Sequence, residues 1–483
     1  MKMKNKPCKN VVVMGAGPAG LSAAYQLSKN DIKVKVFEAQ NQVGGISKTI
    51  VKNGFRFDLG GHRWFTKIDE LDKLVKKLLG RQLIEVYRTS RIFFDGRYFD
   101  YPIKISNVLK GLGFWKSTKV VLSYLLVRIK YRLNPKPLKT FEDWTIANFG
   151  YVLYSYFFKT YTEKLWGIPC RQIGAQWAAQ RIKGLSLSSA IRNALIPAKS
   201  KPKTLIDKFL YPKFGIGRIC ERLAEEIKKH NNQIALMTTV KQVNHKNGKI
   251  ISVIVEEKTG GAIKTREIAA DQFISSIPLT QLIRILTSAA PQAIIDASKK
   301  LTYRALITVH IIIDRPQITS DTWVYIHDSA AGLGRLHEPK NWSKYMVANQ
   351  NQSSLVCELW CQENDEVWRK NDSQLIKLVM KDLTEVMNFI TIEDVVDAFV
   401  VRTSKAYPVY KIGYQKPLKI IQEYLSRFEN LQLVGRYGTY KYNNMDHSIL
   451  GGLWAAKNII LGKRIYDLEQ INADLEYHEE KQN

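Results

Sequence analysis

A glycine-rich turn near the N-terminus constrains the fold of this chain more than any other feature. The turn is a G-x-G-x-x-G pattern made by Gly15, Gly17 and Gly20. The apolar run 11–14 before it has the composition of a short buried strand, and residues 21–37 after it read as a helix followed by a second such strand. Strand, glycine turn, helix and strand at this length are typical of a nucleotide-binding βαβ unit. We therefore predict an α/β fold that begins with a Rossmann-like domain.

Each glycine of the turn has its own physical reason. Gly15 permits the tight turn, Gly17 lets the backbone approach a pyrophosphate, and Gly20 lets the helix pack closely on the strand. The first helical turn, with Pro18 and Ala19, then presents free N–H groups and a positive dipole to the phosphates. The turn therefore predicts a site for a dinucleotide.

The residues that follow the turn indicate which dinucleotide is bound. Glu38 lies at the end of the second strand, where a carboxylate accepts both hydrogen bonds of an adenosine ribose. NAD would satisfy these features as well as FAD. Two further glycine loops expose backbone that can line a long, buried dinucleotide, which favours FAD. The residues at these loops are Ala39, Gly44, Gly45, Gly60, Gly61 and His62.

The arrangement resembles the superfamily of FAD-dependent amine oxidases and protoporphyrinogen oxidases, and within it the UDP-galactopyranose mutase-like branch. The resemblance rests on Gly60-Gly61-His62 and on the stretch 435–448, and it spans residues 11 to about 462. It implies that FAD is the cofactor and that 435–436 passes beside the flavin. It also implies that a helix near Asp446 points its positive end at the flavin's pyrimidine edge. The cofactor-binding residues that the resemblance adds are Val240, Ser275, Gly435, Arg436, Asn444, Asp446, His447 and Ser448.

A second group of aromatic and basic residues is expected to form the substrate cleft. An anionic substrate, such as a nucleotide diphosphate, requires arginines in a mainly aromatic cleft. The alternative is that each arginine is a solvated or salt-bridged surface residue, and that His62 only caps a loop. The candidate substrate residues are Arg181, Tyr303, Arg304, Tyr325, Arg335, Tyr407 and Tyr410. The candidate catalytic residues are His62, Arg304, Arg436 and Tyr440.

Two functions are consistent with these residues. In the first, hydride passes between flavin N5 and a sugar-nucleotide or lipid-linked glycan substrate. In the second, a mutase-type isomerase uses the reduced flavin as a nucleophile, without net redox change. The residues 63–67 after His62 lack the small apolar side chains associated with mutases, which favours the oxidoreductase. A protoporphyrinogen oxidase-like or amine oxidase-like oxidase is a further alternative.

Signals of the nucleotide-binding domain occur at the start, middle and end of the chain, so we predict two interleaved domains. Asn247-Gly248 predicts a hairpin turn, and the β-branched run 305–313 predicts an antiparallel sheet in the substrate-binding part. The predicted FAD-binding ranges are 1–90, 205–280 and 425–470. The predicted substrate-binding ranges are 91–204 and 281–424.

The charge of the chain is strongly positive. It contains 73 Lys and Arg against 44 Asp and Glu, a formal net charge of +29. This excess attracts anionic partners, or it reflects a lysine bias of the whole proteome. The basic residues are spread along the chain without a nucleic-acid motif, so we expect no nucleic-acid partner. The apolar and basic segment 105–133 allows peripheral contact with an anionic membrane, and the alternative is an amphipathic core helix.

The five cysteines are an odd and scattered set, which argues against a disulfide framework and for a reducing compartment. Cys357 and Cys361 have no second cysteine or histidine pair nearby, so we predict no metal site. No run of about 18 apolar residues predicts a membrane-spanning helix. We therefore expect a cytoplasmic protein, peripheral to the inner face of the membrane if 105–133 makes contact.

Overall fold

The structure is a computed structural model that describes residues 9–101, 103, 105–175, 177, 208–287 and 289–472, without the side chains of 105 and 106. A five-stranded parallel sheet of order β19-β13-β1-β2-β9 organises one half of it. Four consecutive residues of the central strand are buried, as a strand covered on both faces requires. The predicted α/β fold is confirmed. The strands are β1 (Asn10–Met14), β2 (Lys33–Phe37), β9 (Gln233–Ala235), β13 (Gln272–Ser275) and β19 (Leu431–Leu433).

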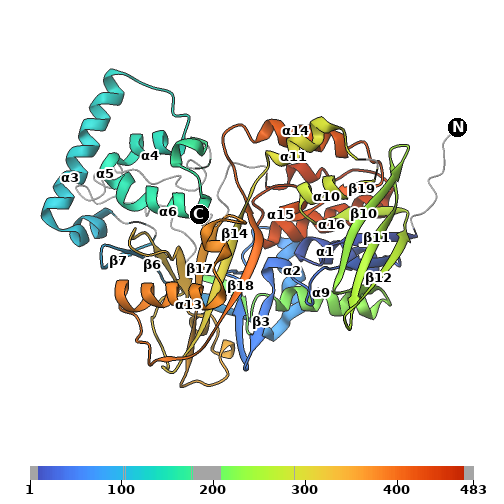
Figure 1. The fold of residues 1–483 in the computed structure, drawn as a ribbon, viewed down its shortest axis with the longest axis horizontal. Coiled ribbons are helices and arrows are strands. Elements are labelled where there is room, and N and C mark those ends of the chain that lie inside the picture. The colour runs from blue at the N-terminus through green and yellow to red at the C-terminus, as the bar shows by residue number, and fades with distance from the viewer. Residues whose placement is uncertain are drawn as a thin grey trace.

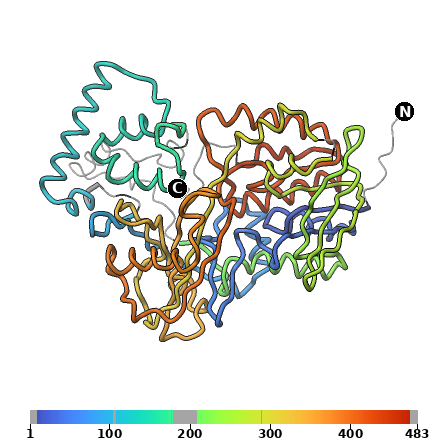
Figure 2. The backbone as a smooth tube through the Cα atoms, viewed as in Figure 1, coloured from blue at the N-terminus to red at the C-terminus, as the bar shows by residue number. Residues whose placement is uncertain are grey.

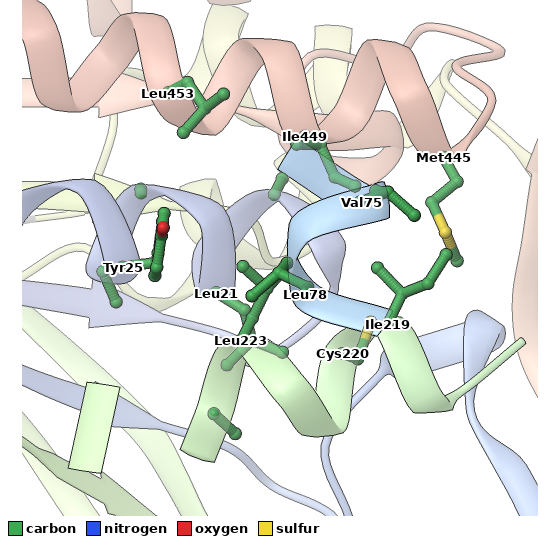
Figure 3. Close-up of a cluster of buried hydrophobic side chains, with 14 of the residues drawn as sticks. Leu21, Tyr25, Val75, Leu78, Ile219, Cys220, Leu223, Met445, Ile449 and Leu453 are labelled. Atoms are coloured by element: carbon green, nitrogen blue, oxygen red, sulfur yellow. The ribbon is translucent and has the colours of Figure 1, made fainter. Parts of the chain in front are cut away.

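Four helices pack together beside this sheet: α1 (Pro18–Ser28), α2 (Asp69–Leu79), α9 (Arg218–Lys229) and α16 (Met445–Leu461). Figure 3 shows their shared apolar core, in which Leu21 of α1 meets Leu78 of α2 and Leu223 of α9. Gly452 of α16 lies against α1 so closely that a Cβ there would be 2.1 Å from the carbonyl oxygen of Ala19. The N-terminal and C-terminal helices are therefore in backbone contact.

A three-stranded meander extends from this half of the molecule. It consists of β10 (Thr238–Lys246), β11 (Lys249–Thr259) and β12 (Ala262–Ala269). Asn247 and Gly248 both have positive φ, at 50° and 72°, as a two-residue hairpin loop requires. The hairpin that this dipeptide predicts is confirmed.

A seven-stranded sheet of order β18-β14-β17-β16-β15-β6-β7 forms the other half. Every residue of β14 is buried, which agrees with its β-branched run. The expectation of an antiparallel sheet is wrong for one pair of strands, because β6 and β15 run parallel to each other. In this pair Ser90 lies opposite Trp323. These strands are far apart in sequence, so no hairpin dictates their direction. The strands are β6 (Ser90–Phe94), β7 (Arg97–Asp100), β14 (Tyr303–Ile313), β15 (Trp323–Ile326), β16 (Arg335–His337), β17 (Ser353–Cys361) and β18 (Val395–Pro408).

A helical group lies beyond β6 and β7 at one end of the molecule (Figure 1). Its core is aromatic and includes Phe99, Phe141 and Phe157. No helix within the described ranges is both long and apolar enough to cross a bilayer. The group contains α3 (Ile105–Leu133), α4 (Phe141–Phe149), α5 (Tyr151–Tyr154) and α6 (Thr160–Trp166), with a π-helical segment (Ser155–Lys159) between the last two.

The chain crosses between the two halves several times, and Figure 2 shows N-terminal and C-terminal segments in the same half, where β13 separates β1 from β19 in the parallel sheet. The five strands of that sheet fall inside the predicted nucleotide-binding ranges. Two small ribbons connect the halves: β3 (Thr49–Lys52) with β4 (Phe55–Asp58), and β5 (Leu83–Tyr87) with β8 (Lys208–Pro212). The remaining helices are α10 (Leu279–Ile285), α11 (Gln292–Lys299), α12 (Glu366–Arg369), α13 (Asp372–Lys381), α14 (Gln415–Leu425) and α15 (Gly435–Gly438).

Candidate functional site

A cavity of about 1250 Å³ is lined by the parallel sheet, the seven-stranded sheet and the helical group. Small-molecule pockets usually have volumes of roughly 300–1,000 Å³. The cavity therefore has room for a long dinucleotide together with a second molecule.

The glycine turn lies at one end of this cavity. A Cβ on Gly17 would meet nothing within 4 Å, so the backbone of Gly17 faces open space. Gly15 has φ +98°, and a Cβ there would be 2.4 Å from Oγ of Ser276. Gly20 does not line the cavity but packs against the turn. A Cβ on Gly20 would be only 2.0 Å from the carbonyl oxygen of Gly15. The turn thus has the geometry that its sequence predicts, with Pro18 and Ala19 at the cavity.

Glu38 is fixed beside the turn by backbone donors. The N–H of Ala16 donates to its Oε2 at 2.8 Å, and the N–H of Gln40 donates to its Oε1 at 3.0 Å. The carboxylate lines the cavity and keeps lone pairs for further donors. Ala39 and Val240 line the same end. This end can hold the hydroxyls and the base of a nucleoside.

The N-terminus of α16 also faces the cavity. Asn444 caps this 17-residue helix in a capping box with His447, whose Nδ1 accepts from the N–H of Asn444 at 3.4 Å. Asn444, Asp446 and Ser448 line the cavity, whereas His447 does not. Two helix N-termini, those of α1 and α16, thus direct positive dipoles into one space.

A buried ion pair lies under the Gly60-Gly61-His62 loop. Nε of Arg335 is 2.7 Å from Oε1 of Glu358, which is fully buried. A Cβ on Gly60 would be 3.1 Å from that same Oε1, and the N–H of Gly61 is directed at the carboxylate. Burial raises the pKa of Glu358, although the neighbouring guanidinium opposes this shift. Glu358 therefore holds both the loop and Arg335.

Arg335 is held by Glu358 at one side and lines the cavity at the other. Its guanidinium lies over the rings of Trp323, at 4.8 Å, and Trp360, at 5.3 Å, and donates to the hydroxyl of Tyr407 at 2.9 Å. The ion pair with Glu358, the contacts with two indole rings and the hydrogen bond to Tyr407 fix its orientation.

His62 lies at the cavity as a neutral imidazole. Burial is the main reason that its pKa is lowered to about 3, and the charges of Arg436 and Arg335 lower it further. The backbone carbonyls of Leu59 and Ile46 oppose this shift. At neutral pH the ring therefore offers hydrogen bonds without charge.

Arg436 carries a positive charge at the same place. Its Nε and Nη2 donate to the carbonyl oxygen of Asn443 at 3.0 and 2.8 Å, and its Nη1 donates to that of Ala406 at 3.1 Å. The guanidinium also lies over the rings of Tyr407 and Tyr442. Within the described residues no carboxylate forms an ion pair with it, so its charge is not compensated.

The far end of the cavity is aromatic and cationic. Phe157, Tyr161 and Trp166 line it from the helical group, and Trp323 and Tyr325 line it from the sheet. Across the whole lining, eight cationic side chains face two carboxylates, those of Glu38 and Asp446. The cationic side chains are Lys48, Arg63, Lys67, Arg88, Arg335, Arg402, Lys405 and Arg436.

Arg304 and Tyr440 of the predicted set lie outside the lining. Arg304 is buried and donates to the carbonyl oxygens of Leu165, at 3.0 Å, and Lys164, at 2.8 Å. The hydroxyl of Tyr440 donates to the carbonyl oxygens of Thr302 and Val409. These polar groups join backbone segments, so the structure places them as structural residues and not at the cavity.

Tyr303, Tyr410 and Ser275 are not part of the lining either. The hydroxyl of Tyr303 donates to the carbonyl oxygen of Tyr437, and that of Tyr410 accepts from the N–H of Tyr442. Ser276 lines the cavity in place of its neighbour Ser275. Gly44 and Gly60 shape their loops with positive φ and do not line the cavity. Arg181 lies outside the described residues.

Glu358 is the main residue that the sequence prediction did not find. It stands in the apolar strand β17, and its neighbours Cys357 and Leu359 are buried as well. A carboxylate in such a strand has to be paired, because burial of an isolated charge is very costly. A single carboxylate within an apolar run is therefore a sequence signal that could have identified Glu358.

Comparison with known proteins agrees with the site. The sequence model of the family described as flavin containing amine oxidoreductase matches residues 18–460. The chain is 23% identical over 492 residues to coproporphyrinogen III oxidase of Staphylococcus aureus, covering 94% of this chain and 99% of that protein. It is 26% identical over 274 residues to 1-hydroxycarotenoid 3,4-desaturase of a Flavobacterium species, covering 53% of this chain and 55% of that one. The chain thus matches about half of the desaturase's length.

Solved structures show the same fold. Reduced UDP-galactopyranose mutase superposes with a TM-score of 0.81 at 22% identity, covering 97% of this chain and 98% of that one. A putative protoporphyrinogen oxidase from an Exiguobacterium species superposes with a TM-score of 0.69 at 18% identity, covering 94% and 99%. At these identities the likeness concerns the fold alone.

Proposed function

Because this chain belongs to the flavin-containing amine oxidoreductase family and is an FAD-dependent oxidoreductase, we propose that it oxidises or reduces an anionic substrate in the aromatic end of the cavity. The predicted superfamily and the predicted cofactor are confirmed by the family match. We propose a sugar nucleotide or a lipid-linked glycan as the substrate class.

The residues of the cavity fit FAD. The open space at Gly17 would take the pyrophosphate, and Glu38 would accept hydrogen bonds from the ribose. The N-terminus of α16 and the loop that ends at His62 would hold the flavin ring. When bound, FAD accepts or donates the hydride at N5.

The side chains around the proposed flavin position have separate tasks. Arg436 and the helix dipole of α16 stabilise negative charge at that end of the cavity. His62 remains neutral and orients a bound group by hydrogen bonding. The aromatic walls exclude water, which strengthens these interactions.

The charge of the lining is the observation that supports an anionic substrate. Eight cationic side chains and two carboxylates line the cavity. Three of the cations pair with carboxylates outside the lining, Arg335 with Glu358, Arg402 with Asp372 and Lys405 with Glu363. The other five still outnumber the two carboxylates, so the potential of the cavity is positive. Several of these cations are guanidinium groups, which match phosphate and carboxylate geometry. Aromatic rings beside them suit a nucleobase or another flat ring.

A porphyrinogen is the second candidate substrate. A porphyrinogen carries carboxylates on a large ring system, so it would suit a cavity lined by cations and aromatic rings. The Staphylococcus aureus relative named for coproporphyrinogen III aligns over 94% of this chain. Mutase-type isomerisation of a sugar nucleotide, without net redox change, is the alternative reaction at the same site.

The experiment uses the FAD-loaded enzyme in oxidised and dithionite-reduced form. UDP, UDP-galactose and coproporphyrinogen III are titrated separately, and the flavin absorbance spectrum is recorded. Binding of UDP supports the sugar-nucleotide class, and binding of the porphyrinogen alone moves the proposal to the second candidate. Sugar interconversion without flavin reoxidation identifies an isomerase. Absence of any spectral change with all three ligands contradicts both the sugar nucleotide and the porphyrinogen as substrates.

A matched pair of variants tests the charge argument. Arg88 lines the cavity, whereas Arg81 is exposed outside it. We expect Arg88→Gln to weaken binding of the anionic ligand roughly tenfold, because a hydrogen bond to a charged group is lost. Arg81→Gln removes the same charge and should leave binding unchanged.

A further inference from the structure

Helix α3 has a buried face that belongs to the core of the helical group. Val108, Leu112, Val120 and Tyr124 are at most 8% exposed and share a cluster with Phe141. This face satisfies the expectation of an amphipathic core helix.

A second apolar face of the same helix points away from the protein. Gly113, with φ 77°, interrupts the helix, and the segment that follows begins with Phe114 and Trp115. At 100° per residue, the exposed side chains lie on the side of the helix opposite Val120 and Tyr124. Seven large apolar side chains on this face are between 48% and 80% exposed: Phe114, Trp115, Leu122, Leu125, Leu126, Ile129 and Leu133. An exposed apolar stripe of this kind marks an interaction surface.

Positive charges border this stripe on both sides. Lys119 and Lys130 lie along one edge, and Arg128 and Arg132 lie along the other. All four side chains are exposed, and no described carboxylate pairs with them. The range 105–133 contains no Asp or Glu at all. Figure 1 shows α3 at the outer edge of the molecule, where nothing in the described part of the chain covers it.

We propose that this face of α3 docks on an anionic lipid bilayer. The apolar stripe would enter the boundary between head groups and acyl chains, and the four cations would contact the negative head groups. A second copy of this chain fits less well, because a symmetric contact would bring like charges together. This docking goes beyond the proposed function and does not depend on the identity of the substrate.

The position of α3 connects this surface to the cavity. Phe141, Phe157 and Phe158 line the aromatic end of the cavity and pack in the same cluster as the buried face of α3. Docking would therefore hold the aromatic end next to the bilayer. This geometry suits a lipid-linked member of the substrate class, and only this last step rests on the proposed function.

The test is co-sedimentation of the FAD-loaded enzyme with vesicles. We expect it to bind vesicles that contain phosphatidylglycerol and not vesicles of phosphatidylcholine alone. Each of the four basic residues should contribute about a fivefold gain in partition, so removing all four should weaken binding by roughly six hundredfold. The variant for this test is K119Q/R128Q/K130Q/R132Q.

A control with the same change in net charge separates docking by α3 from the general positive charge. It replaces four exposed lysines on the nucleotide-binding half, in the variant K33Q/K35Q/K258Q/K264Q. We expect this control to bind anionic vesicles nearly as well as the unmodified enzyme. Equal losses in the two variants, or no binding by the unmodified enzyme, would overturn the proposal.

The apolar part of the surface has its own variant, Leu126→Ser combined with Leu133→Ser. We expect vesicle binding to fall while FAD content stays constant, since neither side chain touches the cavity. If these substitutions change the sedimentation coefficient of the free enzyme instead, the face is a contact between copies and the proposal is wrong. A failed vesicle assay leaves the ligand titrations unaffected, so the two proposals are judged separately.

Discussion

Replacement of Glu358 by glutamine removes the negative charge under the Gly60-Gly61-His62 loop and keeps the side chain's shape. At the observed 2.7 Å between Arg335 and Glu358, the Coulomb attraction is about 6 kcal/mol at an effective dielectric constant of 20. Arg335 cannot release its proton, so Glu358→Gln leaves a buried charge without a counterion. Such a loss costs about 3–5 kcal/mol. Glutamine still accepts hydrogen bonds, so we expect a loss of about 3 kcal/mol in unfolding free energy.

The assay is urea unfolding followed by tryptophan fluorescence, with FAD retention measured in parallel. The control Glu363→Gln removes an exposed carboxylate that pairs with Lys405, and should cost less than about 1 kcal/mol. In the double variant R335M/E358Q no uncompensated charge remains, so we expect most of the stability to return. If the effects of the two substitutions simply add, or if Glu358→Gln behaves like the control, the ion pair does not anchor the loop.

Three further predictions concern other parts of the site. Gly452→Ala places a methyl group against the carbonyl of Ala19. This should lower the unfolding free energy by about 1–3 kcal/mol and weaken FAD binding. Unchanged FAD affinity would contradict the close helix contact. Glu38→Gln should raise the Kd for FAD roughly tenfold in a fluorescence titration, because a charge-assisted acceptor is lost; an unchanged Kd would mean that the ribose lies elsewhere. Burial raises the pKa of Asp58 from 3.8 to about 6, so the folded state binds the proton more tightly than the unfolded state. Stability should therefore fall by about 3 kcal/mol as pH rises from about 4 to about 6 and then level off. Urea midpoints across this range should be flat for Asp58→Asn, and a persistent slope would assign the effect to another group.

The sequence predicts the local features of the nucleotide site well. The first strand, predicted from residue 11, begins at Asn10, and the helix predicted near Asp446 begins at Met445. These elements follow from contiguous patterns: an apolar run, a glycine turn and a capping residue. Asn247-Gly248 succeeds for the same reason, because turn geometry depends on the two residues themselves.

The sequence predicts the substrate end less well, because its polar residues find partners far along the chain. Arg304 meets carbonyl groups about 140 residues away, and Tyr440 meets one that is 138 residues away. The local sequence around an arginine or a tyrosine does not show whether its side chain faces a cavity or a carbonyl group. The parallel pairing of β6 with β15 has the same origin, since no short connection sets the direction of these strands.

The contact between α1 and α16 has a consequence for the synthesis of this protein. The central strand β1 leaves the ribosome first, but its neighbour β13 and the edge strand β19 follow only after residues 272 and 431. Gly452 then has to reach the carbonyl of Ala19 before the second helix N-terminus faces the cavity. The cavity is therefore complete only once α16 has been synthesised. We expect a chain that stops short of α16 to lack FAD and to be open to proteases.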